Sequence, residues 1–435
     1  MFRVNPLPPS PLSPPSPGRI AQTALLRYSC IDHDTDTTHS RQPWRVEVKL
    51  HPALFRLLDF PGVVAYFDGV RDARRIGESQ ERRPIYHIKI RSGELRLLVV
   101  AGIHGTEPAP VNACALLPSL LRERYPLGFN FERLREVEIH IVPLANPDGF
   151  ARNYRYFAER GFSPHWSHVW EDARFTSCGE DINGDWMRLR LPETRALHRV
   201  FNEVDPHVVL DLHEFYAKGG CPPRWAEETE GFRATLTDVP YRWVNGAIKE
   251  ISGELARAVA ERLDWEPKMR HFSGGASEDF LAAPTCLGTH LPYEGAAKVL
   301  VETWGVALGP YLLPDRVTIH LQAILATLEF MEEHKDELLA MKEEWRREER
   351  EIGRSRVGFL IRGEELEEAG ELLSLHGISW ERRGEGLFVP MPQVRSRMAL
   401  LLLDEDCEHN RDLASRHKGP YTLNRLLRVE SEVAG

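Results

Sequence analysis

Two histidines and a glutamate stand directly after apolar runs in the first half of the chain. His104 and Glu107 lie three residues apart in a turn that follows the apolar run Leu97–Ala101, and His213 follows a second run, Val208–Leu212. Such runs predict buried strands, and ligands of open α/β sheets bind at the carboxyl ends of the strands. Two imidazoles and a carboxylate supply the three ligands with which catalytic zinc sites leave a fourth position for water. Mg²⁺ and Ca²⁺ favour sets richer in oxygen, so zinc is the predicted metal.

Another carboxylate, Glu302, follows the apolar run Val299–Val301 and is the candidate base. A carboxylate beside a metal and apolar walls has a tunable pKa, which suits it to take a proton from a zinc-activated water. Taken alone, Glu302 is equally compatible with a helix N-cap or a surface position. Asp211 and Glu214 flank His213, and strand alternation turns both away from the ligand face unless one accepts a hydrogen bond from a metal-binding histidine.

The elements that must position these residues alternate along the chain. Alternating strands and helices imply a largely parallel sheet that is covered on both faces. The predicted fold is therefore an α/β fold with a mixed, mostly parallel twisted sheet flanked by helices. Strands are predicted at 46–50, 85–90, 95–101, 137–144, 208–212 and 298–302, and helices at 111–124, 191–204, 244–263 and 317–345.

Composition divides the chain into three regions. Residues 1–42 are rich in proline and serine and are predicted to be a disordered tail, because such sequence cannot build a core. Residues 43–345 carry the candidate site. Residues 355–435 predict a small α+β domain with a structural or substrate-gating role. Its predicted strands are 357–361 and 386–389, and its predicted helices are 364–376 and 393–403.

Charge and cysteine content narrow the classes of partner and compartment. The 435 residues carry a net charge of −10, which argues against a nucleic acid or an anionic membrane as partner. The six cysteines are widely spaced, which is typical of reduced thiols in an intracellular protein. No apolar run reaches transmembrane length, and the first residues lack the apolar core of a secretory signal. We therefore expect a cytoplasmic protein, and the sequence leaves its oligomeric state open.

Five motifs occur in an order that resembles the zinc carboxypeptidases of the carboxypeptidase A family. They are His-Gly-Thr-Glu at 104–107, Asn-Pro-Asp-Gly at 146–149, Gly-Glu-Asp-Ile-Asn at 179–183, His213 and Glu302. The resemblance covers roughly residues 80–335. It implies a mixed eight-stranded sheet, one zinc ion and hydrolytic release of a carboxyl-terminal residue. It also implies that His104, Glu107 and His213 bind the metal and that Glu302 is the general base.

The same resemblance implies roles for three further residues. Arg174 matches an arginine that stabilises the oxyanion, and Arg155 is the alternative candidate for that role. Asn183 matches a residue that binds the terminal carboxylate of the substrate.

The chain departs from the family pattern in two places. The family has an arginine that grips the substrate carboxylate after Asp-x-Asn, and this chain has Gly184. The candidates for a replacement cation are Arg188, Arg190 and Arg270. The family also has a loop tyrosine before Ser-Gly-Gly, where this chain has Arg270 and His271. Their predicted roles are binding of a substrate carboxylate for Arg270 and proton donation for His271.

Three functions are compatible with these residues. The first is a zinc metallopeptidase of the carboxypeptidase type, a hydrolase acting on peptides. The second is a deacylase of N-acyl amino acids that resembles aspartoacylases and succinylglutamate desuccinylases, which share the metal ligands. The third is a zinc-binding homologue without catalytic activity. Gly184 and the missing loop tyrosine favour this third function. The Ser-Gly-Gly loop favours the peptidase, and Glu302 with a candidate arginine argues against the non-catalytic homologue.

Overall fold

A computed structural model describes most of the chain after residue 56. The described residues are 57–124, 129–160, 172–216, 234–237, 239, 243–263, 268–269, 284–306, 309–310, 313–354, 356–415 and 428–433. The predicted tail at 1–42, the predicted strand at 46–50, and Arg270 and His271 lie outside these ranges.

An eight-stranded mixed sheet organises the described residues up to position 354, which we call the large-sheet part. The strand order is β1-β2-β4-β3-β5-β8-β6-β7, and the four central strands β4, β3, β5 and β8 run parallel. β2 is antiparallel to both β1 and β4, and β6 is antiparallel to β8. This arrangement confirms the predicted α/β fold. The strands are β1 (Ala73–Glu78), β2 (Pro84–Ile90), β3 (Leu95–Ala101), β4 (Val137–Val142), β5 (Val208–Tyr216), β6 (Ala234–Thr237), β7 (Lys268–Met269) and β8 (Ala297–Val306).

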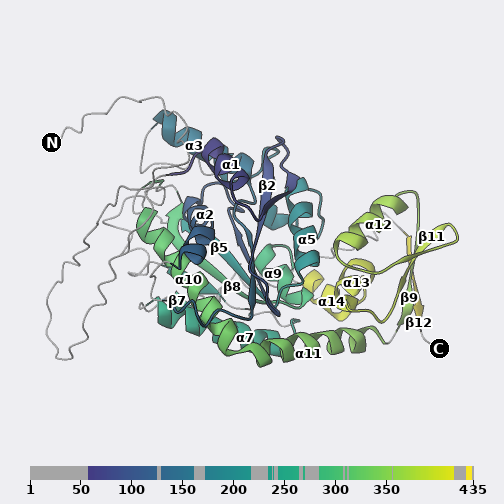
Figure 1. Ribbon diagram of the computed structural model, residues 1–435. Coiled ribbons are helices and arrows are strands. Elements are labelled where there is room, and N and C mark those ends of the chain that lie inside the picture. Colours follow the sequence, from purple (N-terminus) through teal and green to yellow (C-terminus); the bar gives the residue numbers. More distant parts are fainter. Residues whose placement is uncertain are drawn as a thin grey trace, which may run out of the picture. The chain divides into compact units, whose positions relative to one another are not determined.

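Helices cover both faces of this sheet (Figure 1). α2 and α10 pack against each other and against β3 and β5 on one face, and α5 packs against β2 and β3 on the other. Because both faces are covered, the central strands begin with mostly apolar, buried residues; Leu97, Val99 and Leu210 are fully buried. The helices are α1 (Phe60–Asp68), α2 (Pro108–Glu123), α3 (Pro147–Arg160), η2 (Ile182–Gly184), α5 (Pro192–Val204), α7 (Gly246–Arg262), α9 (Leu287–His290), η3 (Leu291–Glu294), α10 (Leu313–Glu333) and α11 (Lys335–Gly353).

The prediction of one long helix over 317–345 was wrong, because α10 and α11 meet at His334. His334 has φ −113° and ψ 36°, which is not helical, and its ring stacks on Phe330 with the ring centroids 4.2 Å apart. Hydrogen bonds from the amide of His334 to Phe330 and from the amide of Leu338 to His334 continue on either side of the break. Neither proline nor glycine stands at this position, so no local residue type marks the break in advance.

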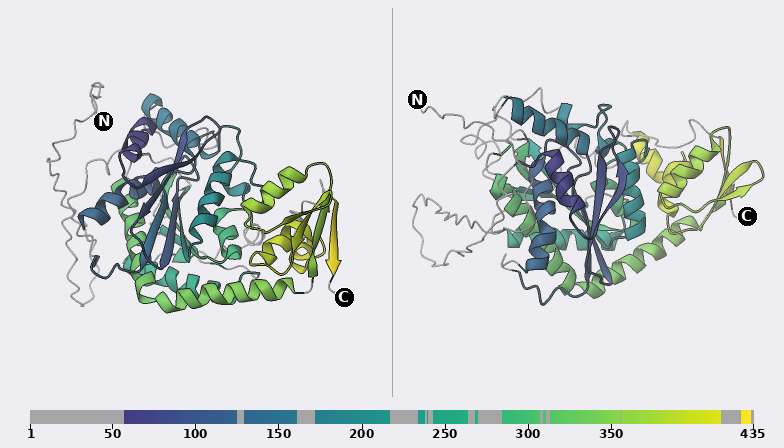
Figure 2. Two further views of the ribbon diagram at one scale, coloured as in Figure 1. Left: turned by 45° about the vertical axis from the view of Figure 1, so that its right-hand side comes forward. Right: turned by 45° about the horizontal axis from the view of Figure 1, so that its top comes forward.

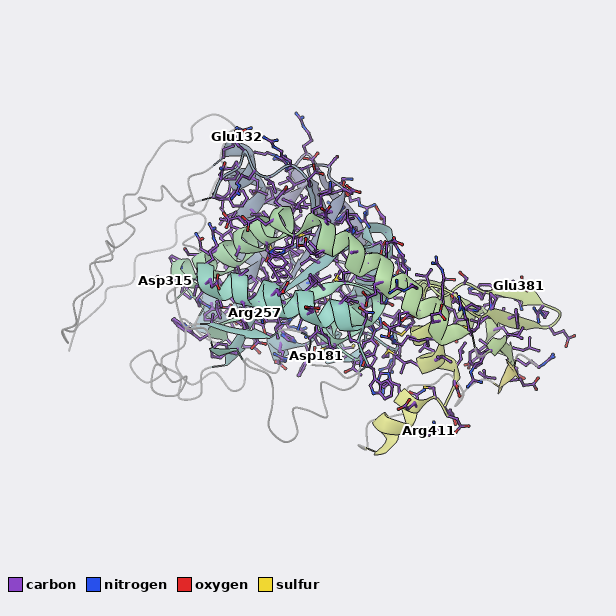
Figure 3. The ribbon with its side chains drawn as sticks, turned by 90° about the horizontal axis from the view of Figure 1, so that it is seen from below. Glu132, Asp181, Arg257, Asp315, Glu381 and Arg411 are labelled. Carbon is purple, nitrogen blue, oxygen red and sulfur yellow. The ribbon has the colours of Figure 1, made fainter. Side chains whose placement is uncertain are left out.

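A second, smaller sheet follows α11, and we call residues 356–433 the C-terminal part. Its strand order is β10-β11-β9-β12, and all three pairings are antiparallel. α11 leads to it from the large-sheet part in both views of Figure 2, and α12 contacts α5. Figure 3 labels Asp181 in the large-sheet part and Glu381 in the C-terminal part. The elements of the C-terminal part are β9 (Arg356–Arg362), α12 (Leu366–Leu375), β10 (Glu381–Arg383), β11 (Gly386–Pro390), α13 (Ser396–Leu403), α14 (Glu408–Ser415) and β12 (Arg428–Val433).

Among the helices of the described ranges, none combines the length and the apolar composition needed to cross a bilayer.

Candidate active site

His104, Glu107 and His213 converge in the interior, at the carboxyl end of β3 and beside β5. The Nδ1 atoms of the two histidines lie 3.2 Å apart. Glu107 spans both rings, with Oε1 2.6 Å from Nδ1 of His104 and Oε2 2.9 Å from Nδ1 of His213. All three side chains are buried, so their polar atoms face one another in a space that excludes most solvent.

The spacing of these atoms fits a zinc ion. Zn–N bonds of about 2.0–2.1 Å at tetrahedral angles place two ligand nitrogens about 3.3 Å apart. The observed separation of 3.2 Å between the two Nδ1 atoms agrees with that value. The donor set of two imidazoles and one carboxylate is also one that zinc accepts in catalytic sites.

A carboxylate stands behind each histidine. Nε2 of His104 is 3.3 Å from Oδ1 of Asp181, and Nε2 of His213 is 2.9 Å from Oδ1 of Asp211. A carboxylate in this position keeps the proton on Nε2, directs the lone pair of Nδ1 inward and raises the basicity of the ligand. Of the two acidic neighbours of His213, Asp211 is therefore the one whose carboxylate faces Nε2 of its ring.

Glu214 points away from the two histidines into a buried ionic network. Oε1 accepts hydrogen bonds from Arg316 at 2.7 Å and from the hydroxyl of Thr303 at 3.1 Å, and Oε2 accepts one from the amide of Ala109 at 3.1 Å. Burial raises the pKa of Glu214, and the guanidinium of Arg316 opposes that rise. The amide of Glu214 also donates to Oε2 of Glu107 at 3.1 Å, so β5 fixes the start of α2 and the orientation of Glu107.

Two glycines allow the loop that carries His104 to pack closely. A Cβ atom on Gly105 would lie 2.0 Å from the carbonyl carbon of Gly149, and one on Gly149 would lie 2.5 Å from the carbonyl oxygen of Ala173. Neither clash can be relieved by a side-chain rotation, because both contacts are with backbone. The backbone of the loop at Gly105, of the Asn-Pro-Asp-Gly turn and of Ala173 is therefore closely packed next to His104.

Arg174 lies beside Glu107, and Arg155 does not. Nη1 of Arg174 is 3.6 Å from Oε1 of Glu107, and its Nε is 3.6 Å from Oδ2 of Asp181. Nδ2 of Asn146 donates to the carbonyl of Arg174 at 3.1 Å, which holds the backbone at this position. Arg155 is exposed on α3. Of the two arginines that the resemblance offered, only Arg174 lies among the candidate metal ligands.

Glu302 lies next to His213 on the neighbouring strand. The two residues are register partners in the parallel pair of β5 and β8, so their side chains emerge on the same face of the sheet. Burial raises the pKa of Glu302, and the nearby His213 opposes the rise. The prediction that both residues end their strands was wrong: the two strands continue to pair with each other as far as Tyr216 and Val306.

The segment that follows Asp181 carries the departure from the family pattern. Oδ1 of Asn183 accepts a hydrogen bond from the amide of Leu287 at 3.3 Å. Gly184 is exposed, and the nearest atom to a Cβ added there would be Cβ of Asp181 at 4.0 Å, so a side chain would fit. Of the candidate replacement cations, Arg188 is exposed, and Arg190 pairs with Glu180 at 2.8 Å.

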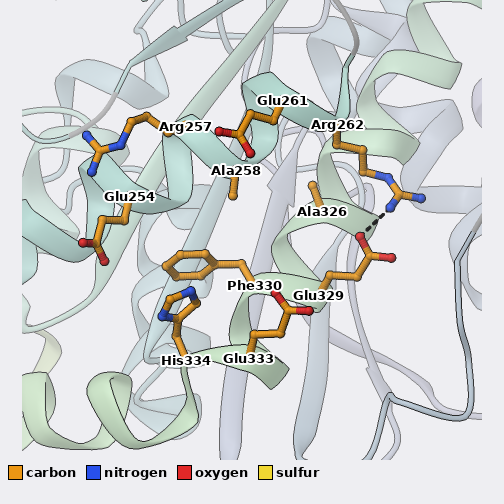
Figure 4. Close-up of a pocket in the computed structure, with 10 residues that line it drawn as sticks. All are labelled: Glu254, Arg257, Ala258, Glu261, Arg262, Ala326, Glu329, Phe330, Glu333 and His334. Atoms are coloured by element: carbon orange, nitrogen blue, oxygen red, sulfur yellow. Dashed lines mark hydrogen bonds and ion pairs between the residues drawn. The ribbon is translucent and has the colours of Figure 1, made fainter. Parts of the chain in front are cut away.

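A separate hollow lies between α7 and α10, and Figure 4 shows the side chains that line it. Arg262 and Glu329 form an ion pair within it, and Phe330 and His334 line another side. None of the predicted site residues is among its lining residues. We therefore place the candidate chemistry at His104, not in this hollow.

Comparisons with known proteins match the region that contains most of the site. Residues 67–283 match the family model of the zinc carboxypeptidases. The segment includes all three predicted metal ligands, Arg174 and Asn183, and it ends before Glu302.

Similar curated proteins and solved structures carry the name carboxypeptidase, at low identity to this chain. Probable carboxypeptidase 2 of Arthroderma benhamiae is 30% identical over 127 residues, which are 29% of this chain and 20% of that protein. Carboxypeptidase 2 of Trichophyton rubrum is 28% identical over 133 residues, 31% of this chain and 21% of the relative. The matched part of this chain thus spans about a fifth of the length of these relatives. A metallo-carboxypeptidase structure from Pseudomonas aeruginosa is 17% identical, with a TM-score of 0.44 over 63% of this chain and 68% of that one.

The matched segment and the motifs within it agree with the resemblance inferred from the sequence. Residues 67–283 of this chain therefore match the zinc carboxypeptidases, and β8, which lies beyond the matched segment, belongs to the same sheet.

Proposed function

We propose that this protein is a zinc-dependent metallocarboxypeptidase that hydrolyses the carboxyl-terminal peptide bond of a peptide. One observation carries the proposal: Glu107 spans His104 and His213, with Arg174 3.6 Å from Glu107 and Glu302 in register with His213. A pure zinc-binding module needs neither the arginine nor the second glutamate. The match to the zinc carboxypeptidase model does not favour the deacylase.

Glu302 and Arg174 have different roles in the proposed hydrolysis of the peptide bond. Zinc, when bound by His104, Glu107 and His213, polarises a carbonyl group and acidifies water. Glu302 takes the proton of the attacking water and passes it to the leaving amine, and its raised pKa suits both steps. The guanidinium of Arg174 stabilises the negative charge that develops on the carbonyl oxygen.

A substrate panel tests the proposal directly. We expect turnover of unblocked peptides that exceeds turnover of N-acyl amino acids, and we expect a chelator to abolish it and added zinc to restore it. Preferential cleavage of N-acyl amino acids would instead support the deacylase. Stoichiometric zinc binding without turnover of either class would support the non-catalytic homologue.

The enzyme should still require a free carboxylate on its substrate, despite Gly184. An unpaired carboxylate is costly to bury, so a cation other than the family arginine must meet it. A charge-assisted contact contributes roughly 1.5–3 kcal/mol, so the carboxamide of a good peptide substrate should show a kcat/KM at least about tenfold lower than the free acid. Equal turnover of acid and amide would show that no cation replaces the missing arginine.

Gly184→Arg is the matched variant for this comparison, because the structure has room for a side chain at this position. Restoring the family arginine should widen the difference between acid and amide. Gly179→Arg is the control, since a Cβ at Gly179 meets no atom within 4 Å, although its φ of +79° disfavours a side chain.

We also propose a cytoplasmic location. The support is that the four cysteines in the described ranges, Cys114, Cys178, Cys286 and Cys407, are free thiols. Fractionation of the source cells with an antibody against the protein tests this location.

A further inference from the structure

Four buried side chains meet where the C-terminal part contacts α5. They are His198 on α5, His290 at the end of α9, Glu294 at the end of η3, and His376, which caps the carboxyl end of α12. Each is fully buried. One potential ligand atom from each of the four lies within 4.8 Å of the others.

The outer nitrogen of each histidine faces a backbone carbonyl. Nδ1 of His198 lies 3.2 Å from the carbonyl of Leu375, and Nδ1 of His290 lies 2.9 Å from that of Pro284. Nε2 of His376 lies 3.2 Å from the carbonyl of Met187. A carbonyl can only accept, so each of these nitrogens carries a proton and donates it. The other nitrogen of each neutral ring is therefore an unprotonated atom with a lone pair.

The three lone pairs and Glu294 share one small space. Nε2 of His290 is 3.2 Å from Oε1 of Glu294, and Nδ1 of His376 is 3.9 Å from the same oxygen. Lone pairs and a carboxylate are all acceptors, so hydrogen bonds among them require extra protons. A proton on His290 would satisfy that ring and one carboxylate oxygen. It would leave Nε2 of His198 and Oε2 of Glu294 without a hydrogen-bond partner among the described protein atoms.

We propose that His198, His290, Glu294 and His376 bind a second divalent metal ion, and that this ion is zinc. Three imidazole nitrogens and one carboxylate oxygen complete a tetrahedral set, and imidazole-rich sets suit zinc. The backbone carbonyls of Leu375, Pro284 and Met187 orient the rings, as hydrogen-bond acceptors behind metal-bound histidines do.

The site is structural, because the protein supplies all four ligands and solvent does not reach them. Trp186 lies against it, with its ring centroid 4.9 Å from that of His198. Three ligands belong to the large-sheet part and the fourth, His376, to the C-terminal part. The ion therefore links the two parts at a contact that also holds the ion pair of Arg195 with Glu371 at 2.8 Å.

Metal content of the purified full-length protein tests the proposal. We expect about two equivalents of zinc per chain, one in the open site at His104 and one in this closed site. His290→Ala and His376→Ala should each reduce the content to about one equivalent and lower the melting temperature, because an ion bound only by the folded state stabilises it. His409→Ala removes a buried histidine outside the cluster and should leave the metal content unchanged.

If His290→Ala and His376→Ala do not fold, the proposal can still be tested on a protein in which all four residues of the cluster are present. In the His213→Ala protein the first site is disabled, so the remaining zinc should give an X-ray absorption spectrum of about four nitrogen or oxygen ligands at about 2.0–2.1 Å, most of them imidazoles. A content of one equivalent or less in the unmodified protein, with none left in His213→Ala, would overturn the proposal. That result would leave the catalytic proposal intact, since the latter depends on the first site alone.

Discussion

Glu302→Gln should reduce kcat by about 10²–10⁴-fold, the range typical for loss of a general base. The amide has the shape of the carboxylate and cannot take a proton. The structure places Glu302 in register with His213, on the same face of the sheet as the metal ligands, and burial holds its pKa above the ordinary value. KM should change little, because the loss falls on the chemical step.

Steady-state kinetics and zinc content, measured on the same preparations, decide this prediction. The variant should retain its zinc, which separates loss of the base from loss of the metal. Glu254→Gln is the matched control, because Glu254 lines the hollow between α7 and α10, outside the site. A Glu302→Gln enzyme with its full zinc content and near-normal kcat would exclude Glu302 as the base.

His213→Ala should abolish peptide hydrolysis and remove the zinc of the open site. His213 supplies one of three protein ligands, and its Nδ1 lies 3.2 Å from that of His104 and 2.9 Å from Oε2 of Glu107. Two ligands hold zinc poorly. Asp211→Asn should have a smaller effect, a loss of about 10–100-fold in zinc affinity, because Asp211 only orients the ring of His213.

Zinc titration against a competing chelator, followed by activity assays, measures both effects. His207→Ala is the control, since His207 is also buried beside β5 but accepts a hydrogen bond from the amide of Arg96. Unchanged zinc affinity and turnover in His213→Ala would show that the metal binds elsewhere.

The three candidate metal ligands of the first site could be identified in the sequence because they stand in local patterns. His104 and Glu107 are three residues apart after an apolar strand, and that spacing alone places both side chains at one end of β3. Apolar runs predicted β3 with its exact bounds, Leu95–Ala101. The same signals fail where the chain carries no local cue, as at His334, where one residue ends α10.

The carboxyl ends of β5 and β8, unlike the bounds of β3, could not be predicted from the sequence. β5 and β8 were expected to stop at His213 and Glu302, where the apolar runs stop. They continue because each strand supplies the hydrogen-bond partners of the other for several more residues. This pairing is a long-range property, since about ninety residues separate the two strands in the chain. The choice between Arg174 and Arg155 has the same origin: only the packing of the Asn146 turn against the backbone of Arg174 decides it.

The cluster of His198, His290, Glu294 and His376 belongs entirely to the tertiary structure. Only His290 and Glu294 are close in sequence, four residues apart, and that spacing is common on any helix. Residues 355–435 predict no metal site by themselves, because His376 is the only one of the four cluster residues that they supply. Four isolated side chains become a candidate metal site when α12 docks on α5 and brings His376 to the other three. Local patterns thus specify which residues suit the chemistry, and long-range packing decides which of them meet.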